Sequence, residues 1–348
     1  MVAGAGPVSE AEVRAPYPFR AYAWQQSLWQ SLEELLVQQR LPHALLLSGA
    51  DGLGKERFAK AFAARLLCHQ PRDGVACGQC KSCSLLAAGT HPDLMWLTTL
   101  TDEKTGKTAK AIRVDQVREL VGFAEKSAQM GGWRVVVLSP AHLLNVQAAN
   151  ALLKTLEEPG RDTALMLLTS QPLSLAPTLR SRCQQRPLPI PAEADALAWL
   201  VPQVGDEQKA RLLLALSRGA PLAALALREA EWFSQREPLL KDLMQLTQQR
   251  QTALVTAQRW HSLGAESLLV ALLSLLDDLV VAASGAATVV KHRDLAPIIE
   301  RMSAHFQPAA LLRFRQGLAD RQRLLAGNVQ GNALIDATFS DWVALTSR

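Results

Sequence analysis

The sequence predicts an α/β domain with a parallel sheet, followed by an all-α part. Three observations support this fold class. Short apolar runs alternate with helical periodicity over residues 44–186, which is typical of a parallel sheet covered on both faces. A glycine-rich turn, residues 49–54, joins one such run to the helix after it. Beyond the proline-rich stretch 187–191, the apolar residues follow only the helical period.

Length and composition agree with a globular protein of two or three domains. The chain has 348 residues, 49% hydrophobic and 20% charged, which excludes disordered and low-complexity classes. A net charge of +5 permits an acidic partner such as nucleic acid but does not require one. The sequence shows neither an apolar run long enough for a membrane span nor a signal peptide. We therefore expect a cytoplasmic protein with no membrane partner.

Local patterns predict the individual elements of the α/β part. The expected helices cover residues 28–39, 55–67, 115–127 and 141–157. The expected strands cover residues 44–48, 93–98, 134–138 and 165–169. Asp115 is expected to cap the third helix, and Pro159 with Gly160 to end the fourth. Residues 1–16 are expected to form a loose tail and residues 101–110 a loop.

The remainder of the chain predicts only helices. The proline-rich stretch 187–191 marks a domain boundary. Residues 192–227 are expected to form a small helical unit. From residue 232 onward several amphipathic helices follow, including residues 268–283 and 309–325.

Residues 49–55, GADGLGK, match the first seven positions of a phosphate-binding loop. Glycines there let backbone N–H groups surround phosphate oxygens, and the lysine reaches the β- and γ-phosphates. Gly49, Gly54 and Lys55 are therefore candidate nucleotide-binding residues. The eighth position should be Ser or Thr to hold magnesium, but it is Glu56. We interpret the segment as a degenerate phosphate loop; a chance glycine turn is the alternative.

The residues after the strand at 134–138 also indicate that the chain does not hydrolyse ATP. ATP-hydrolysing proteins of this fold carry Asp, and often Glu, directly after an apolar strand. After the strand at 134–138 the chain has Ser139 and Pro140, which can neither bind magnesium as carboxylates nor act as a base. Two separate losses predict that the fold is kept while the chemistry is gone.

Four of the five cysteines follow the spacing C-x8-C-x2-C-x2-C, at Cys68, Cys77, Cys80 and Cys83. Four thiolates close a tetrahedral Zn²⁺ shell and leave no open position for catalysis. We expect a zinc module over about residues 68–90, with the last three cysteines in a loop. An iron–sulfur cluster and unliganded thiols are the alternatives. The ferredoxin cluster pattern needs a fourth Cys three residues after the third, where this chain has none.

Other charged residues are ambiguous without further context. An ordinary charged surface is the simplest interpretation of Ser181 and Arg182, with Cys183 as a small core residue. Basic residues of the first domain fit either a solvated surface or a stripe that faces DNA. They are Arg113, Arg118, Lys126, Lys154 and Arg161. The histidines His43, His91 and His142 are interpreted as isolated, because the cysteines already complete a metal shell.

Several of these segments resemble one known family. Residues 149–159, ANALLKTLEEP, are similar to the signature helix of bacterial clamp-loader subunits, and Ser181-Arg182-Cys183 is similar to a second motif of that family. The cysteine insertion and residues 89–93, GTHPD, strengthen the resemblance. It covers essentially the whole chain, with high specificity in residues 40–185 and low specificity in the helical C-terminal part. The chain is therefore identified as a member of the AAA+ clamp-loader family.

The resemblance implies three domains and a set of partners. Residues 1–185 would form a RecA-like AAA+ domain, 186–231 a small helical lid, and 232–348 a helical collar for oligomerisation. One delta and three tau/gamma subunits would complete the oligomer, which uses ATP to open the sliding clamp and place it on primed DNA. The resemblance implies that the complex would belong to DNA polymerase III, with its nucleotidyltransferase activity residing in the assembly.

Within the family, the resemblance is to the non-hydrolysing delta-prime branch. ATP-binding members have Gly-Lys-Ser/Thr where this chain has Glu56, and Asp-Glu where it has Ser139 and Pro140. In the lid they have Gly-Ser-Pro-Gly-Arg where residues 219–223 read GAPLA. No intrinsic ATPase is therefore expected. The tau/gamma subunits carry a similar zinc module, so zinc does not discriminate.

The resemblance also gives Arg182 a role. In the family, the arginine of Ser181-Arg182-Cys183 reaches across an interface to a neighbouring subunit's ATP, where a guanidinium stabilises the transferring phosphoryl group. Arg113, beside a helix N-terminus, is our candidate for facing DNA. Two other classes stay open: an autonomous P-loop ATPase that remodels nucleic acid, and a zinc-dependent nucleic-acid-binding module. Glu56 argues against the first, and Arg182 against the second.

Overall fold

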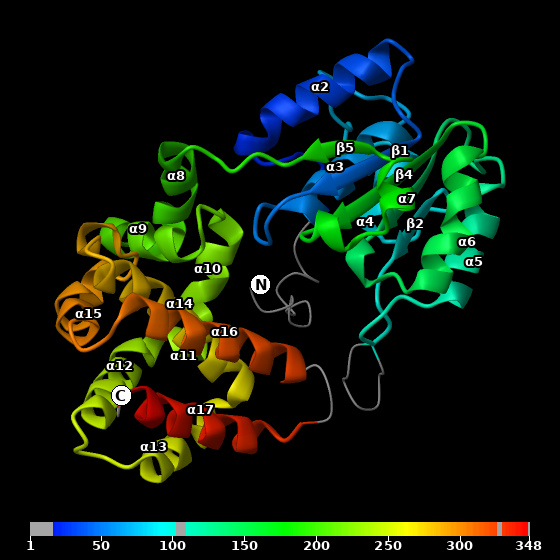
Figure 1. Cartoon of the computed structure of the whole chain (residues 1–348). Helices are drawn as coiled ribbons and strands as arrows, with labels where there is room; N and C mark the ends of the chain where they lie inside the picture. The colour runs from blue at the N-terminus through cyan, green and yellow to red at the C-terminus, as the bar shows by residue number, and fades with distance from the viewer. Residues whose placement is uncertain (1–16, 102–108, 326–328, 347–348) are drawn as a thin grey trace. The chain divides into compact units, whose positions relative to one another are not determined.

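The computed structural model describes residues 17–101, 109–325 and 329–346. They divide into two compact units, with the boundary between Ala196 and Leu197. Figure 1 shows the sheet and its helices in the first unit and only helices in the second. The expected loose tail 1–16 and most of the expected loop 101–110 lie outside the described residues.

The first unit contains a five-stranded parallel sheet. Its strands are β1 (Ala44–Ser48), β2 (Leu94–Leu97), β3 (Arg134–Leu138), β4 (Thr163–Thr169) and β5 (Gln184–Pro187). They lie in the order β2-β3-β4-β1-β5, and each neighbouring pair is parallel. The inner strands are mostly apolar, and nearly all their residues are buried, as expected for a sheet covered on both faces. The predicted parallel sheet is confirmed.

Helices cover both faces of this sheet. On one face, α5 (Val114–Ala124) and α6 (Val146–Glu157) form one buried cluster with alternate strand residues such as Leu46 and Val136. Leu45 and Leu47 point to the opposite face because side chains alternate along a strand. There α3 (Lys55–Leu67) contacts β3 and β4. The other helices of the unit are α2 (Gln26–Val37), α4 (Lys81–Ala87) and α7 (Pro177–Arg180).

Three local predictions are wrong. The expected helix at 141–157 is broken: a short 3₁₀ turn, Ala141–Leu143, precedes α6, whose first turn is capped by the Asn145 side chain. Arg113, not Asp115, holds the N-cap position of α5; its backbone N–H donates to the Gln116 side chain at 3.1 Å. The cysteine segment is not all loop, because α4 begins directly after Cys80.

Strand β5 was not expected, since its residues Gln184, Gln185, Arg186 and Pro187 lack the apolar pattern of a strand. It pairs only with β1, at the edge of the sheet. An edge strand has one open side, where polar side chains and proline are tolerated. Position in the sheet therefore outweighs local propensity in this segment.

The second unit is entirely helical among its described residues, as predicted. Its helices are the end of α8 (Glu193–Val204), α9 (Glu207–Leu216), α10 (Pro221–Glu229), α11 (Glu231–Ser234), α12 (Arg236–Thr247), α13 (Ala253–Trp260), α14 (Ala265–Ala283), α15 (Ala296–Ser303), α16 (Pro308–Leu325) and α17 (Gly331–Thr346). Helix α14 is apolar around most of its circumference and is packed by α11, α12, α15, α16 and α17. The proposed three-domain boundaries, at residues 185 and 231, stay a prediction.

No single helix in the described ranges is long and apolar enough to cross a membrane. Helices α9 and α10 satisfy the length and composition test only when joined across a bend of 106°.

Candidate functional site

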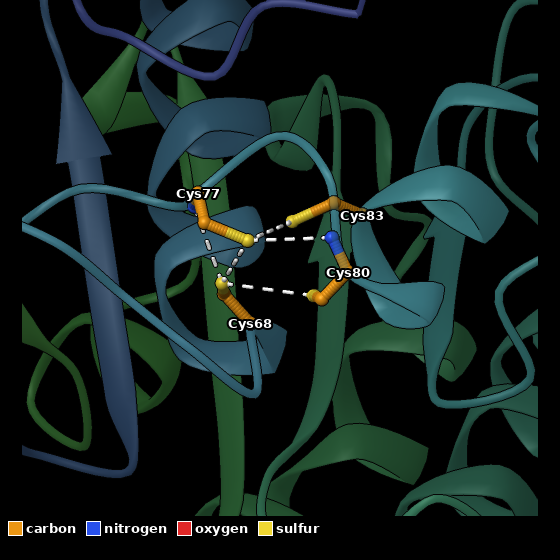
Figure 2. Close-up of side chains that lie close together, drawn as sticks. All are labelled: Cys68, Cys77, Cys80 and Cys83. Atoms are coloured by element: carbon orange, nitrogen blue, oxygen red, sulfur yellow. Dashed lines mark hydrogen bonds between the residues drawn. The ribbon is translucent and has the colours of Figure 1, made fainter.

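The four clustered cysteines converge on one point at the end of α3. Figure 2 shows their sulfur atoms pointing toward one another. The Sγ–Sγ distances are 3.5 Å from Cys68 to Cys77, 3.9 Å from Cys68 to Cys80 and 3.9 Å from Cys77 to Cys83. All four sulfurs lie within 4.8 Å of one another. Zn–S bonds of about 2.3 Å in a tetrahedron put sulfurs about 3.8 Å apart. The site therefore fits a tetrahedral metal ion such as zinc.

Local backbone geometry creates this convergence. Cys68 is the C-cap of α3, and Cys80 is the N-cap of α4, so two helix ends meet at the site. Gly78 has φ +71°, a left-handed conformation that lets the chain turn between Cys77 and Cys80. Backbone N–H groups of Cys77 and Cys80 donate to the sulfurs of Cys68 and Cys77, at 3.3 and 3.4 Å.

The electrostatics of the cluster favour a bound cation. Hydrogen bonds from the backbone N–H groups of Gln79 and Cys80 lower the pKa of Cys77 to about 6. Burial raises the pKa of Cys68 and of Cys83, so without a cation these two thiols stay protonated. A divalent ion would supply the positive charge that four converging thiolates need. When bound, zinc would act structurally, because four protein ligands fill its shell.

A series of buried hydrogen bonds joins this cysteine module to the sheet. His91 Nδ1 accepts from the Asp93 N–H at 3.0 Å, so Nε2 carries the proton and donates to Ser82 Oγ at 2.9 Å. Ser82 Oγ in turn donates to the Leu67 carbonyl at 2.7 Å. Asp93 forms an ion pair with the buried Arg134, with 3.5 Å between Asp93 Oδ1 and Arg134 Nη2. The prediction that His91 is isolated is therefore wrong, and the GTHPD motif at residues 89–93 is the sequence signal for this contact.

The glycine-rich loop lies between β1 and α3, as predicted. Side chains from the segment before α2 pack against it. Gly54 has φ +86°, and a Cβ there would lie 2.8 Å from the Tyr22 ring. Trp24 and the fully buried Gln25 both donate to the Leu53 carbonyl. The segment before α2 therefore packs directly on the loop and requires glycine at position 54.

Lys55 is engaged by the loop itself. Its Nζ lies 2.9 Å from the Gly49 carbonyl, 3.0 Å from the Ala50 carbonyl and 3.3 Å from Asp51 Oδ1. These contacts use the three donors of the ammonium group. Its side chain is only 10% exposed, and burial lowers the pKa of Lys55 while Asp51 opposes the shift.

The two unusual residues near this loop contact each other. Ser139, which follows β3, donates through Oγ to Glu56 Oε1 at 3.0 Å. Glu56 lies in the first turn of α3, at the eighth position of the loop pattern. In a magnesium-dependent site these two positions would supply a hydroxyl and a carboxylate to a shared ion. Here the carboxylate and hydroxyl have exchanged positions and bond directly to each other.

The segment Ser181–Cys183 follows α7 and turns into β5. Leu179 and Cys183 are buried in the cluster formed with α6, and burial raises the pKa of Cys183 to about 11. Ser181 Oγ donates to the Thr178 carbonyl at 3.1 Å. Arg182 is held at the surface between these anchors, one third exposed, and pairs with Glu157 at the end of α6. The structure thus brings Arg182 to the ANALLKTLEEP helix, where its partner is Glu157, a residue that no sequence pattern singles out.

Arg113, the candidate DNA contact, is exposed at the N-terminus of α5. Beside it, Arg118 pairs with Asp115 at 3.1 Å, and both side chains are more than two-thirds exposed. This arrangement fits a solvated helix end as well as a phosphate contact. A DNA-facing role for Arg113 stays a prediction.

Comparisons with known proteins agree over most of the chain. Residues 24–191 match the family described as "DNA polymerase III, delta subunit", and residues 230–333 match "DNA polymerase III, delta subunit, C terminal". The chain is 46% identical to DNA polymerase III subunit delta' of Pseudomonas aeruginosa, over 69% of this chain and 71% of that protein. It is 37% identical to the Escherichia coli subunit delta', over 84% and 85%.

More distant similarity extends to other subunits. The chain is 32% identical to DNA polymerase III subunit tau/gamma of Haemophilus influenzae, over 49% of this chain and 23% of that protein. Among solved structures, a gamma subunit-related protein of Thermotoga maritima aligns with a TM-score of 0.45 and 15% identity, over 91% of this chain and 99% of that one.

Proposed function

Because the chain belongs to the DNA polymerase III delta' family, we propose that it is a non-hydrolysing subunit of the clamp loader. In this role it assembles with tau/gamma and delta subunits and helps to place the sliding clamp on primed DNA. It supplies Arg182 to the ATP site of a neighbouring subunit. The relatives include tau/gamma subunits, which supports these partners.

The hydrogen bond between Glu56 and Ser139 is the observation that best supports the absence of hydrolysis. It joins the two positions from which a magnesium ion would be held, and it leaves a carboxylate where triphosphate charge would be greatest. Lys55 is also engaged by its own loop. An autonomous ATPase needs a free lysine and a free hydroxyl in the loop, and a carboxylate after β3. These contacts therefore disfavour the autonomous P-loop ATPase.

Arg182 supports the trans-acting role by its chemistry and exposure. A guanidinium stays charged at any physiological pH and presents a planar fork of donors to phosphate oxygens. In the chain's own loop, Lys55 is bonded to loop carbonyls and Glu56 to Ser139, which favours a neighbouring subunit's ATP site as the place where Arg182 acts. Zinc in the cysteine cluster would act as a structural ion in this proposal, without a part in ATP chemistry. A cytoplasmic location and the contacts with clamp and DNA belong to the same proposal.

An ATPase assay tests this function. The purified chain should hydrolyse ATP at the background rate, with or without primed DNA. Adding tau/gamma, delta and clamp should give DNA-stimulated hydrolysis that requires this chain. Hydrolysis by the chain alone would favour the autonomous ATPase, and an assembled loader indifferent to the chain would contradict the proposed role.

A further inference from the structure

Arg182 is held by two acceptors from different elements. Its Nε donates to Glu157 Oε1 at 2.5 Å, and its Nη2 pairs with the same oxygen. Its Nη1 donates to the Thr178 carbonyl at 3.0 Å. One acceptor therefore comes from the last residue of α6 and the other from α7.

This arrangement leaves part of the guanidinium available. Arginine carries five N–H donors: one on Nε and two on each terminal nitrogen. Three of them are used by Glu157 and Thr178, so one donor remains on Nη1 and one on Nη2. Two donors on adjacent nitrogens are what a bidentate phosphate contact requires.

The acceptors themselves are fixed by buried neighbours. Leu156 precedes Glu157 and is 1% exposed; Leu179, in α7, is also 1% exposed. Both belong to the cluster that includes Cys183, which follows Arg182. The buried residues hold α6 and α7 against each other, so the core sets the position of the Glu157 backbone relative to that of Arg182.

We propose that Glu157 is a positioning residue for Arg182, orienting its guanidinium so that two terminal N–H groups face outward for a neighbouring subunit's triphosphate. The inference rests on the proposed trans-acting role of Arg182. Glu157 does not touch the nucleotide; it acts by restricting the rotamers of a long, flexible side chain. A preoriented arginine loses less entropy when it meets the transferring phosphoryl group.

The proposal predicts a defect in rate without a defect in folding. An exposed ion pair stabilises a protein little, so Glu157→Ala should fold, bind metal and assemble normally. The ATP turnover at the site served by Arg182 should fall about 10-fold, because a misplaced catalytic group costs up to about 100-fold and the Thr178 carbonyl still holds one nitrogen. KM for ATP should change little. Glu157→Gln keeps an acceptor oxygen and should lose less.

The experiment measures steady-state ATP turnover of the reconstituted loader with clamp and primed DNA. The variants are Glu157→Ala, Glu157→Gln, Arg182→Ala and the double variant Glu157→Ala/Arg182→Ala. Glu158→Ala is the matched control, since it removes the adjacent carboxylate while Arg182 keeps its partner. Thermal unfolding and analytical gel filtration check each complex.

The proposal expects reduced turnover in Glu157→Ala, a smaller loss in Glu157→Gln, wild-type turnover in Glu158→Ala, and a double variant no slower than Arg182→Ala. If Arg182→Ala lowers turnover while Glu157→Ala does not, the positioning role is overturned and the trans-acting role survives. If Arg182→Ala has no effect, both fail. Turnover above wild type in Glu157→Ala would mean that Glu157 withholds Arg182, which also overturns the proposal.

Discussion

The glycine-rich loop and the Ser181–Cys183 turn each contain one basic side chain, Lys55 and Arg182. The two side chains differ in exposure and in how many of their N–H donors are already used. Lys55 is nearly buried and uses its donors on its own loop. Arg182 is one third exposed and keeps two N–H groups free of the contacts with Glu157 and Thr178. The comparison teaches that, within one domain, the cation of the glycine-rich loop has its donors occupied by its own loop, whereas the cation after α7 keeps donors for a further contact.

Removing the metal should have the largest effect and should separate the two regions. Structural zinc of this type contributes on the order of 10 kcal/mol to its module. Cys80→Ser, or a strong chelator, should raise hydrogen exchange over residues 68–90, next to the end of α3, and leave residues 177–183 protected. Lowering the pH should also release the metal, because cysteine thiols must lose their protons to bind it.

Elemental analysis of the purified protein gives the complementary measurement. One zinc per chain is expected, and Cys80→Ser should lose it. Cys183→Ser is the matched control, because this fifth cysteine is buried away from the cluster and should leave the metal bound. Iron, or no metal, would contradict the assignment.

Replacing Arg182 should have the next largest effect, and only in the assembly. A trans-acting arginine is worth roughly 10³–10⁵ in rate at its own site. Arg182→Ala should lower DNA-stimulated ATP turnover of the loader, with a smaller bulk loss because the other ATP sites do not face this subunit. Stability should change by about 0.5 kcal/mol or less, as for other surface substitutions.

Arg182→Lys sharpens the same comparison. An ammonium keeps the charge but cannot donate the side-on hydrogen bonds to Glu157 and present a planar fork of donors at once. Rescue should therefore be poor. Full turnover in Arg182→Lys would show that charge alone is sufficient and would weaken the proposed geometry.

Sequence patterns predicted the sheet, the loop and the cysteine cluster well, because each depends on local periodicity or spacing. They failed where a contact joins distant segments. Taken alone, Glu56 and Ser139 each indicate a lost magnesium ligand, but their mutual hydrogen bond depends on β3 and α3 being neighbours. Likewise β5 is polar and becomes a strand only through its place beside β1. The pairing of Arg182 with Glu157, 25 residues apart, has no periodic signature.

Disrupting the Glu56–Ser139 bond should have a modest effect. Glu56→Ala should destabilise the first unit by about 1 kcal/mol, since a hydrogen bond to a charged group is worth about 1.5–3 kcal/mol and Glu56 is exposed. Glu56→Gln keeps an acceptor and should lose less. Urea unfolding gives the midpoint shift. An unchanged midpoint in Glu56→Ala would show that the bond does not stabilise the loop.

We propose that this chain acts on a neighbouring subunit's ATP and not on its own, and a side-by-side assay tests this most directly. Loader complexes containing wild-type chain, Lys55→Ala or Arg182→Ala would be compared for ATP turnover and clamp loading on primed DNA, after equal assembly is verified. The account predicts wild-type behaviour for Lys55→Ala, the smallest effect of all, and a clear loss for Arg182→Ala. A large loss in Lys55→Ala together with normal turnover in Arg182→Ala would contradict it.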